Sequence, residues 1–168
     1  WDEGTLTEDP NVVLNECAGV LQYAQTVFEG LKAYTTEDGH IVTFRPDLNA
    51  ERMMDSAARL EMPVFPKEKF IDAVNKVVAA NAAYVPPYGS GATLYIRPYM
   101  FGSNPVIGVK PADEYQFRMF CTPVGPYFKG GAKPITVKIS NFDRAAPHGT
   151  GHIKAGLNYA MSLHGIVT

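Results

Sequence analysis

The sequence lacks several features that would assign it early to a particular class of protein. Among 168 residues there are two cysteines, and 15 Lys and Arg residues nearly balance 17 Asp and Glu residues. Cys17 and Cys121 are too few for a disulfide scaffold, and no C-x-x-C or His-rich spacing indicates a metal site. The missing basic excess gives no support to a nucleic-acid partner or to an anionic membrane surface.

Long apolar runs and targeting signals are also absent. No run approaches the roughly 18–20 residues that cross a bilayer, so we expect no membrane partner. No basic segment followed by an apolar one marks a signal peptide, which favours a cytoplasmic location. The chain begins at Trp1 without an initiator methionine and stops soon after the apolar segment 157–163, so we expect a piece of a longer protein.

What is present is typical of a globular protein. Hydrophobic residues make up 46% of the chain, enough for one domain, or one and a part. Strand patterns come in hairpin-like runs and the helical patterns are grouped, which favours an α+β fold over a doubly wound parallel sheet. The predicted strands are 12–14, 27–34, 41–44, 92–101, 115–122 and 135–139, and the predicted helices are 46–60 and 67–84.

Lys154 is the first candidate for chemistry. It lies among three glycines and next to apolar residues, where desolvation favours a neutral amine that can form a Schiff base with a carbonyl cofactor. On pattern alone, a solvated loop lysine explains the same residues. His148 and His152 nearby read as loop histidines, because their glycine-rich surroundings argue against a helical metal site.

Two further candidates are basic residues on regular elements. Arg52 falls on the polar face of helix 46–60, either as a solvated surface residue or as a clamp for a phosphate. Tyr95 and Arg97 share one face of strand 92–101, either as an ordinary wet face or as a hydroxyl and guanidinium pair for a carboxylate.

At these residues the sequence resembles the branched-chain amino acid aminotransferases, fold type IV enzymes that depend on pyridoxal 5′-phosphate. The resemblance runs in order through nearly the whole chain, which is more specific than any one motif. The matching segments are 23–32, 44–46 with Arg52, 55–57, 94–98, 123–128 and 154–159.

The resemblance implies roles for three residues at the cofactor. Lys154 resembles the lysine that holds pyridoxal phosphate covalently and then moves the substrate proton as general base and acid. Tyr159 resembles the tyrosine that hydrogen-bonds the phenolic oxygen, and Arg52 resembles the arginine that binds the phosphate. Five residues on a regular helix would separate Lys154 and Tyr159 by about 140°, so we expect an extended or turned segment there.

The resemblance also implies a substrate pocket formed by Tyr23, Phe28, Tyr95, Arg97 and Tyr127. The aromatic rings would enclose a leucine, isoleucine or valine side chain, and Arg97 would bind the side-chain carboxylate of glutamate. The implied reaction is a reversible transamination between these amino acids and 2-oxoglutarate.

The resemblance further implies a homodimer, because Val109 matches a position that reaches a neighbouring subunit's pocket. We expect a small N-terminal domain at 1–122, a connection at 123–134 and the start of a large domain at 135–168. Because residues that complete the cofactor site would lie beyond Thr168, we expect the 168-residue piece alone to be inactive. The alternatives are a relative acting on D-amino acids or aminodeoxychorismate, or a non-catalytic binding module that keeps the fold.

Overall fold

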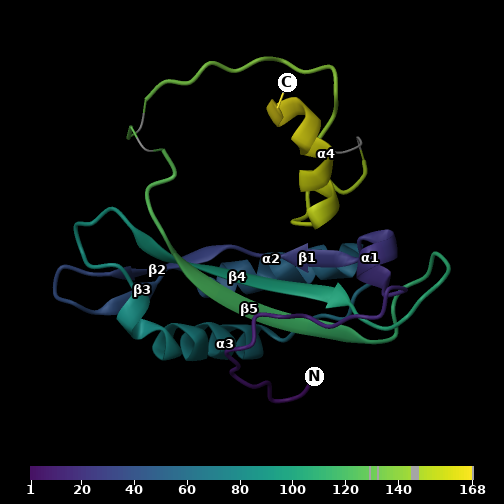
Figure 1. Ribbon diagram of the computed structural model, residues 1–168, viewed down its shortest axis with the longest axis horizontal. Coiled ribbons are helices and arrows are strands. Elements are labelled where there is room, and N and C mark those ends of the chain that lie inside the picture. The colour runs from purple at the N-terminus through teal and green to yellow at the C-terminus, as the bar shows by residue number, and fades with distance from the viewer. Residues whose placement is uncertain (129, 132, 145–147, 168) are drawn as a thin grey trace.

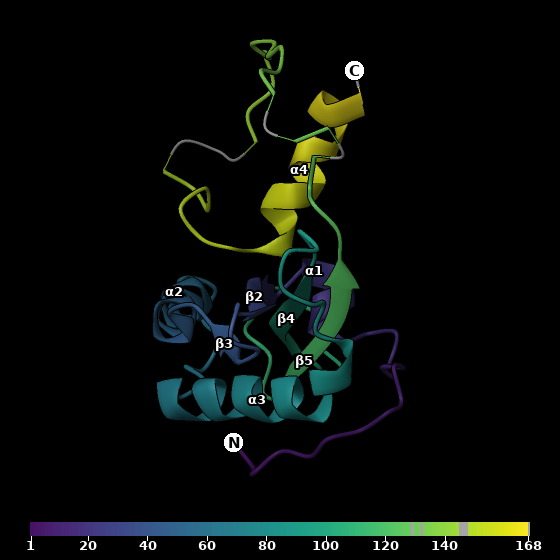
Figure 2. The ribbon, with the colours of Figure 1, turned by 90° about the vertical axis from the view of Figure 1, so that its left-hand side faces the viewer.

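The computed structural model describes residues 1–128, 130–131, 133–144 and 148–167. Within them, five strands form one antiparallel sheet, in which β4 pairs with β1 and β2 on one side and with β5 on the other. Figures 1 and 2 show α2 and α3 packed against the sheet, and together they form what we call the sheet unit. Helix α4 lies on the other side of the sheet. The elements are α1 Gly19–Tyr23, β1 Thr26–Phe28, β2 Leu31–Thr35, β3 Ile41–Thr43, α2 Pro46–Arg59, α3 Lys67–Ala80, a 3₁₀ turn Ala82–Tyr84, β4 Thr93–Gly102, β5 Tyr115–Val124 and α4 Gly156–Val167.

The boundary between β1 and β2 is a break in one ladder rather than a turn. Phe28 lies opposite Tyr99, and Leu31 lies opposite Ile96, so the two short strands keep one register against β4. At the break, the Glu29 N–H donates to the carbonyl of Pro98 at 2.7 Å. Proline has no N–H to return, so the paired hydrogen bonds of a regular ladder cannot form at this position.

The core lies between the sheet and the two helices α2 and α3. Alternation along β4 buries Leu94 and Ile96, while Tyr95 and Arg97 face the other way and stay half-buried. Helix α2 begins with proline in its first turn, which fits helix geometry, and it carries an acidic residue near the start and a basic one near the end. The helix residues buried in this core are Ala50, Met53, Ala57, Phe70 and Val74.

Most of the predicted elements are confirmed. The predicted helices at 46–60 and 67–84 correspond to α2 and to α3 with the 3₁₀ turn, and β4 follows the predicted alternation. The Thr36–His40 turn joins β2 to β3, and the Thr36 N–H donates to the His40 carbonyl at 2.8 Å.

Two predicted strands are wrong. Residues 12–14 and 135–139 are not part of any strand. Val13 is 91% exposed, and Ile135, Val137 and Ile139 are 67%, 80% and 95% exposed. A β-prone sequence becomes a strand only when another strand satisfies its backbone groups, and here no described segment pairs with either run.

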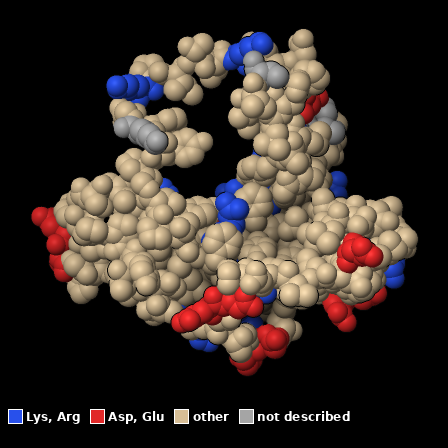
Figure 3. All heavy atoms as spheres, viewed as in Figure 1, with Lys and Arg blue, Asp and Glu red and all other residues tan. Residues whose placement is uncertain are grey.

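Charged side chains are distributed unevenly over the surface. On the face shown in Figure 3, basic side chains lie at the centre and at the top of the molecule, and most of the acidic ones lie at the lower and outer edges. Among the described residues, no helix is long and apolar enough to cross a bilayer.

Candidate functional site

The backbone of Lys154 is fixed between two elements that lie far away in the sequence. Its N–H donates to the Ser56 hydroxyl on α2 at 3.1 Å, and its carbonyl accepts the N–H of Phe28 from β1 at 3.1 Å. The next residue, Ala155, forms an isolated antiparallel bridge with Val27. The C-terminal segment is therefore joined to the sheet unit at Lys154.

The loop before α4 is held in shape by one buried amide. Asn158 is fully buried, and its Nδ2 donates to the carbonyls of Thr150 and Ile153 at 2.7 and 3.0 Å. Its Oδ1 accepts the Thr150 hydroxyl at 2.9 Å. Since every polar atom of the amide has a partner, its burial stabilises the loop around Lys154.

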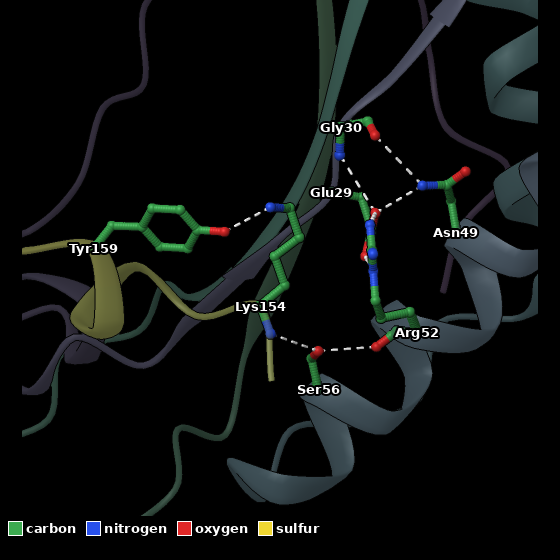
Figure 4. A network of polar contacts seen from close by, with 7 residues as sticks. All are labelled: Glu29, Gly30, Asn49, Arg52, Ser56, Lys154 and Tyr159. Carbon is green, nitrogen blue, oxygen red and sulfur yellow. Dashed lines mark hydrogen bonds and ion pairs between the residues drawn. The ribbon is translucent and has the colours of Figure 1, made fainter. Parts of the chain in front are cut away.

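The side chain of Lys154 lies against two aromatic residues. Its Nζ donates to the Tyr159 hydroxyl at 2.7 Å and lies 4.6 Å from the centre of the Phe28 ring. The rings of Phe28 and Tyr159 are themselves 4.9 Å apart. The prediction of an extended or turned segment from Lys154 to Tyr159 holds only at Lys154 and Ala155, because α4 begins at Gly156 and includes Tyr159. Figure 4 shows Lys154 reaching toward Tyr159.

Arg52 points at a buried carboxylate. Its Nε and Nη2 each donate to Glu29 at 2.7 Å, one to each carboxylate oxygen, and Figure 4 shows the two side chains next to each other. Glu29 is fully buried, whereas the Arg52 side chain is 54% exposed. Hydrogen bonding to Glu29 raises the pKa of Arg52 above its usual value. Arg52 is therefore not a freely solvated surface residue.

Tyr95 and Arg97 meet on one face of β4, as their spacing predicts. Arg97 donates from Nε and Nη2 to the Tyr95 hydroxyl at 3.1 and 2.8 Å, and its guanidinium lies 4.6 Å from the Phe28 ring centre. The hydroxyl approaches Gly30 so closely that a Cβ there would lie 2.3 Å from it. Gly30, Asn49 and Tyr95 also line an open groove of about 280 Å³. Phe28 thus connects the Arg97 pair with Lys154.

The remaining pocket candidates lie outside this cluster. The Tyr23 hydroxyl accepts the N–H of Gly108 at 2.8 Å, so Tyr23 contacts the loop that carries Val109. Val109 is 92% exposed and Tyr127 is 91% exposed, and the Tyr127 ring contacts that of Phe128. The structure therefore brings Lys154, Tyr159, Phe28 and Arg97 together and does not bring these three residues to them.

The described residues offer no metal site, because nowhere among them do three or more His, Cys, Asp or Glu side chains gather for one ion. His148 and His152 are both exposed. Cys17 and Cys121 are both free thiols, and burial raises the pKa of Cys121.

Sequence reasoning missed two residues of the site, Glu29 and Ser56. Both are fully buried polar residues. Alternation with Val27 of β1 and Leu31 of β2 places Glu29 on the core side of the chain between the two strands, and helical spacing places Ser56 beside Met53 on the buried face of α2. A polar residue at a position that periodicity assigns to the core was the signal that could have found them.

Known proteins resemble this chain over almost all of its length. The branched-chain-amino-acid aminotransferase of Haemophilus influenzae is 53% identical over 97% of this chain and 48% of its own length. The one from Helicobacter pylori is 47% identical over 100% of this chain and 51% of its own. The chain thus spans about half the length of these relatives. No protein-family model matches it.

Solved structures give the same result for the fold. The branched-chain aminotransferase of Thermoproteus uzoniensis with norvaline has a TM-score of 0.74 at 24% identity, covering 99% of this chain and 54% of that one. The branched-chain amino acid aminotransferase from Escherichia coli has a TM-score of 0.69 at 28% identity, covering 93% and 48%. Another enzyme of the same name, complexed with N-(5′-phosphopyridoxyl)-L-glutamate, has a TM-score of 0.67 at 28% identity, covering 89% and 46%. This last complex shows that a homologue binds a phosphopyridoxyl group.

Proposed function

Because this chain corresponds in sequence and fold to roughly the N-terminal half of a branched-chain aminotransferase, we propose that it supplies the catalytic lysine of such an enzyme. The proposed activity of the whole protein is the reversible transfer of an amino group between branched-chain L-amino acids and 2-oxoglutarate. The proposal rests on the position of Lys154. Its amine lies 2.7 Å from the Tyr159 hydroxyl, and its backbone is hydrogen-bonded to Phe28 and Ser56.

The residues around Lys154 fit a phosphorylated aldehyde cofactor. Among the described residues, none of the ion pairs includes Lys154, so its amine is not neutralised by a carboxylate. A primary amine that pairs with no carboxylate and lies beside a phenol suits pyridoxal 5′-phosphate, which supplies an electron sink for carbanion chemistry when bound. Lys154 would hold the cofactor covalently, and Tyr159 would hydrogen-bond its phenolic oxygen.

Lys154 would also move the proton of the reaction. Once released from the cofactor, its Nζ would take the proton from the substrate Cα and deliver it to the C4′ carbon of the cofactor, and the second half-reaction would reverse this transfer. Its fixed backbone supports this role, because a general base must stay within hydrogen-bond reach of the atom that it serves. The Phe28 ring beside it would exclude water from this step.

Arg52 would bind the cofactor phosphate with the N–H groups that Glu29 leaves free. Nε and one N–H of Nη2 are used by Glu29, and a guanidinium carries five N–H donors in total. Ser56 links this residue to Lys154, since its hydroxyl donates to the Arg52 carbonyl at 2.8 Å and accepts the Lys154 N–H. One helix would thereby set the distance between phosphate and amine.

Substrate recognition would centre on Phe28, Tyr95 and Arg97. The aromatic faces would contact an apolar side chain, and the guanidinium held by the Tyr95 hydroxyl would receive the side-chain carboxylate of glutamate. Tyr23, Tyr127 and Val109 remain proposed pocket residues. Val109 would serve the site of a second subunit in a homodimer, for which its 92% exposure leaves it accessible.

We further propose that residues 1–168 alone are inactive. Residues 135–139 and the outer side of α4 expose apolar side chains that a following part of a large domain would cover. In this proposal, 1–122 is the small domain, 123–134 the connection and 135–168 the start of the large domain.

The attachment of the cofactor is tested by trapping. The complete product of the gene that encodes residues 1–168 is incubated with pyridoxal 5′-phosphate, reduced with borohydride and mapped by peptide mass spectrometry. We expect the label on Lys154 in the natural protein and in the control Lys32→Ala, and no label at this peptide in Lys154→Ala. Labelling of a lysine beyond residue 168 instead would place the attachment outside this chain and refute the proposal.

The choice of substrate is tested on the same complete protein. Leucine should act as amino donor with 2-oxoglutarate, and D-alanine should not. Preferred use of D-alanine would indicate a D-amino acid enzyme, and lyase activity on aminodeoxychorismate would indicate the other relative. A non-catalytic binding module would give neither turnover nor label.

A further inference from the structure

Glu29 occupies a core position that would normally hold an apolar residue. It lies on the same face as Val27 and Leu31, and all three side chains are buried. A carboxylate in such a place loses its hydration, a cost that is offset only when its oxygens are bound by charged or polar partners. The sequence therefore carries a costly residue where a valine or leucine would stabilise the fold more simply.

Every contact of this carboxylate leads toward the proposed phosphate site. Oε1 accepts Arg52 Nε at 2.7 Å, and Oε2 accepts Arg52 Nη2 at 2.7 Å. Oε2 also accepts Asn49 Nδ2 at 2.8 Å and the Gly30 N–H at 3.3 Å. Asn49 and Arg52 are neighbours on one face of α2, so the carboxylate lies between that helix and the chain segment that joins β1 to β2 (Figure 4).

The geometry of the pair leaves part of Arg52 available. Glu29 binds the guanidinium along its Nε–Nη2 side, so both N–H groups of Nη1 and one of Nη2 remain outside the pair. More than half of the Arg52 side chain is exposed, so a ligand can reach it. A long side chain in this setting would otherwise sample several rotamers.

We propose that Glu29 is a positioning residue for anion recognition, which fixes the guanidinium of Arg52 so that its free edge receives a phosphate. The inference rests on the proposed function, in which that phosphate belongs to pyridoxal 5′-phosphate. Glu29 also carries a negative charge that repels a phosphate. The proposal therefore requires the gain from orientation to exceed this repulsion, and the sign of the effect is measurable.

The experiment compares two probes that differ only in the phosphate, pyridoxal 5′-phosphate and pyridoxal, on the complete gene product. In Glu29→Gln we expect the Kd of the phosphorylated probe to rise about tenfold, because charge-assisted hydrogen bonds orient Arg52. The Kd of pyridoxal should change by less than about twofold, since Lys154 is untouched. Asp47→Asn is the matched control, because Asp47 pairs with exposed Arg45 at the start of the same helix and should alter neither Kd.

The variant Arg52→Ala distinguishes the proposed role of Arg52 from the inferred role of Glu29. If it leaves the preference for the phosphorylated probe unchanged, the role of Arg52 in the proposed function fails, and the inference fails with it. If Arg52→Ala abolishes the preference and Glu29→Gln leaves it intact, only the inference is overturned. In the double variant, Glu29→Gln should cause no further loss, because Glu29 acts through Arg52.

Two other outcomes also count against the inference. Tighter binding of the phosphorylated probe by Glu29→Gln would show that repulsion dominates, and an equal loss for both probes would show a purely structural role. If Glu29→Gln does not fold, Asn49→Ala serves instead, because it removes one donor to Glu29 and keeps the Arg52 pair. We then expect about a threefold rise in Kd for the phosphorylated probe alone, and an unchanged value overturns the inference.

Discussion

Replacing Ser56 with alanine should loosen the junction that fixes Lys154. The hydroxyl makes two bonds, one to the Arg52 carbonyl at 2.8 Å and one from the Lys154 N–H at 3.1 Å. The first is a bond back to the preceding turn of the helix, which adds little because alanine is itself the better helix former. The second joins segments that are 98 residues apart, and losing it leaves the Lys154 N–H without its protein partner.

We expect a loss of about 1–2 kcal/mol in the free energy of local opening at Lys154, since an orphaned backbone donor costs about this much. This corresponds to an amide hydrogen-exchange rate roughly tenfold faster, because about 1.4 kcal/mol is one factor of ten. The measurement is hydrogen exchange by mass spectrometry on a peptide covering residues 153–158, together with urea unfolding of the chain.

Ser162→Ala provides the matched control. Ser162 makes the same bond to the preceding turn, from its hydroxyl to the Asn158 carbonyl at 2.8 Å, and no hydrogen bond to a distant segment is found for it among the described residues. We expect its effect on unfolding to stay within about 0.5 kcal/mol. Equal exchange rates at residues 153–158 in Ser56→Ala and Ser162→Ala would refute the role given to Ser56.

Two other substitutions test the face of β4 and the alkaline stability. Gly30→Ala should displace the Tyr95 hydroxyl, 2.3 Å from the added Cβ, and cost about 1–2 kcal/mol in urea unfolding as the bonds from Arg97 are lost; wild-type stability would contradict this. Burial raises the pKa of Tyr115 above its usual 10.0, so the fold resists its ionisation and loses this stabilisation as the pH rises through the raised pKa. Tyr115→Phe should therefore lose less unfolding free energy than the natural chain between pH 8 and pH 11, and equal losses would show that Tyr115 does not contribute.

The spacing of apolar residues predicted the helices and strands that bury one face in the core. The helix at Pro46–Arg59 and the alternation of Leu94 and Ile96 follow directly from which side chains avoid water. The run at 135–139 has the same apolar character, yet a strand depends on a partner that the local sequence does not encode. The prediction there failed because pairing is a property of two segments.

The sequence predicted the reactive residues of the candidate site, but it did not predict the buried residues that hold them in place. Lys154, Tyr159 and Arg97 lie in short motifs that a resemblance can recognise, and the structure brings them around Phe28. Glu29 also lies in a matching segment, but the resemblance gives it no role, and its partner Arg52 is 23 residues away, so the contact appears only when the chain around Glu29 packs against the helix. Supports of this kind are set by tertiary contacts.

The break at Glu29 and Pro98 places two different features on the two sides of the sheet. Because the register is the same before and after the break, the chain crosses it without an inserted residue. The Glu29 carboxylate is buried on the core side, and the next residue, Gly30, has no side chain and lies directly under the Tyr95 hydroxyl. A residue with a backbone N–H at position 98 could donate to the Glu29 carbonyl, and β1 and β2 could then form one continuous strand. Pro98 thus keeps Glu29 and Gly30 outside the regular ladder, so that the buried carboxylate and the contact under Tyr95 lie in adjacent residues between two strands.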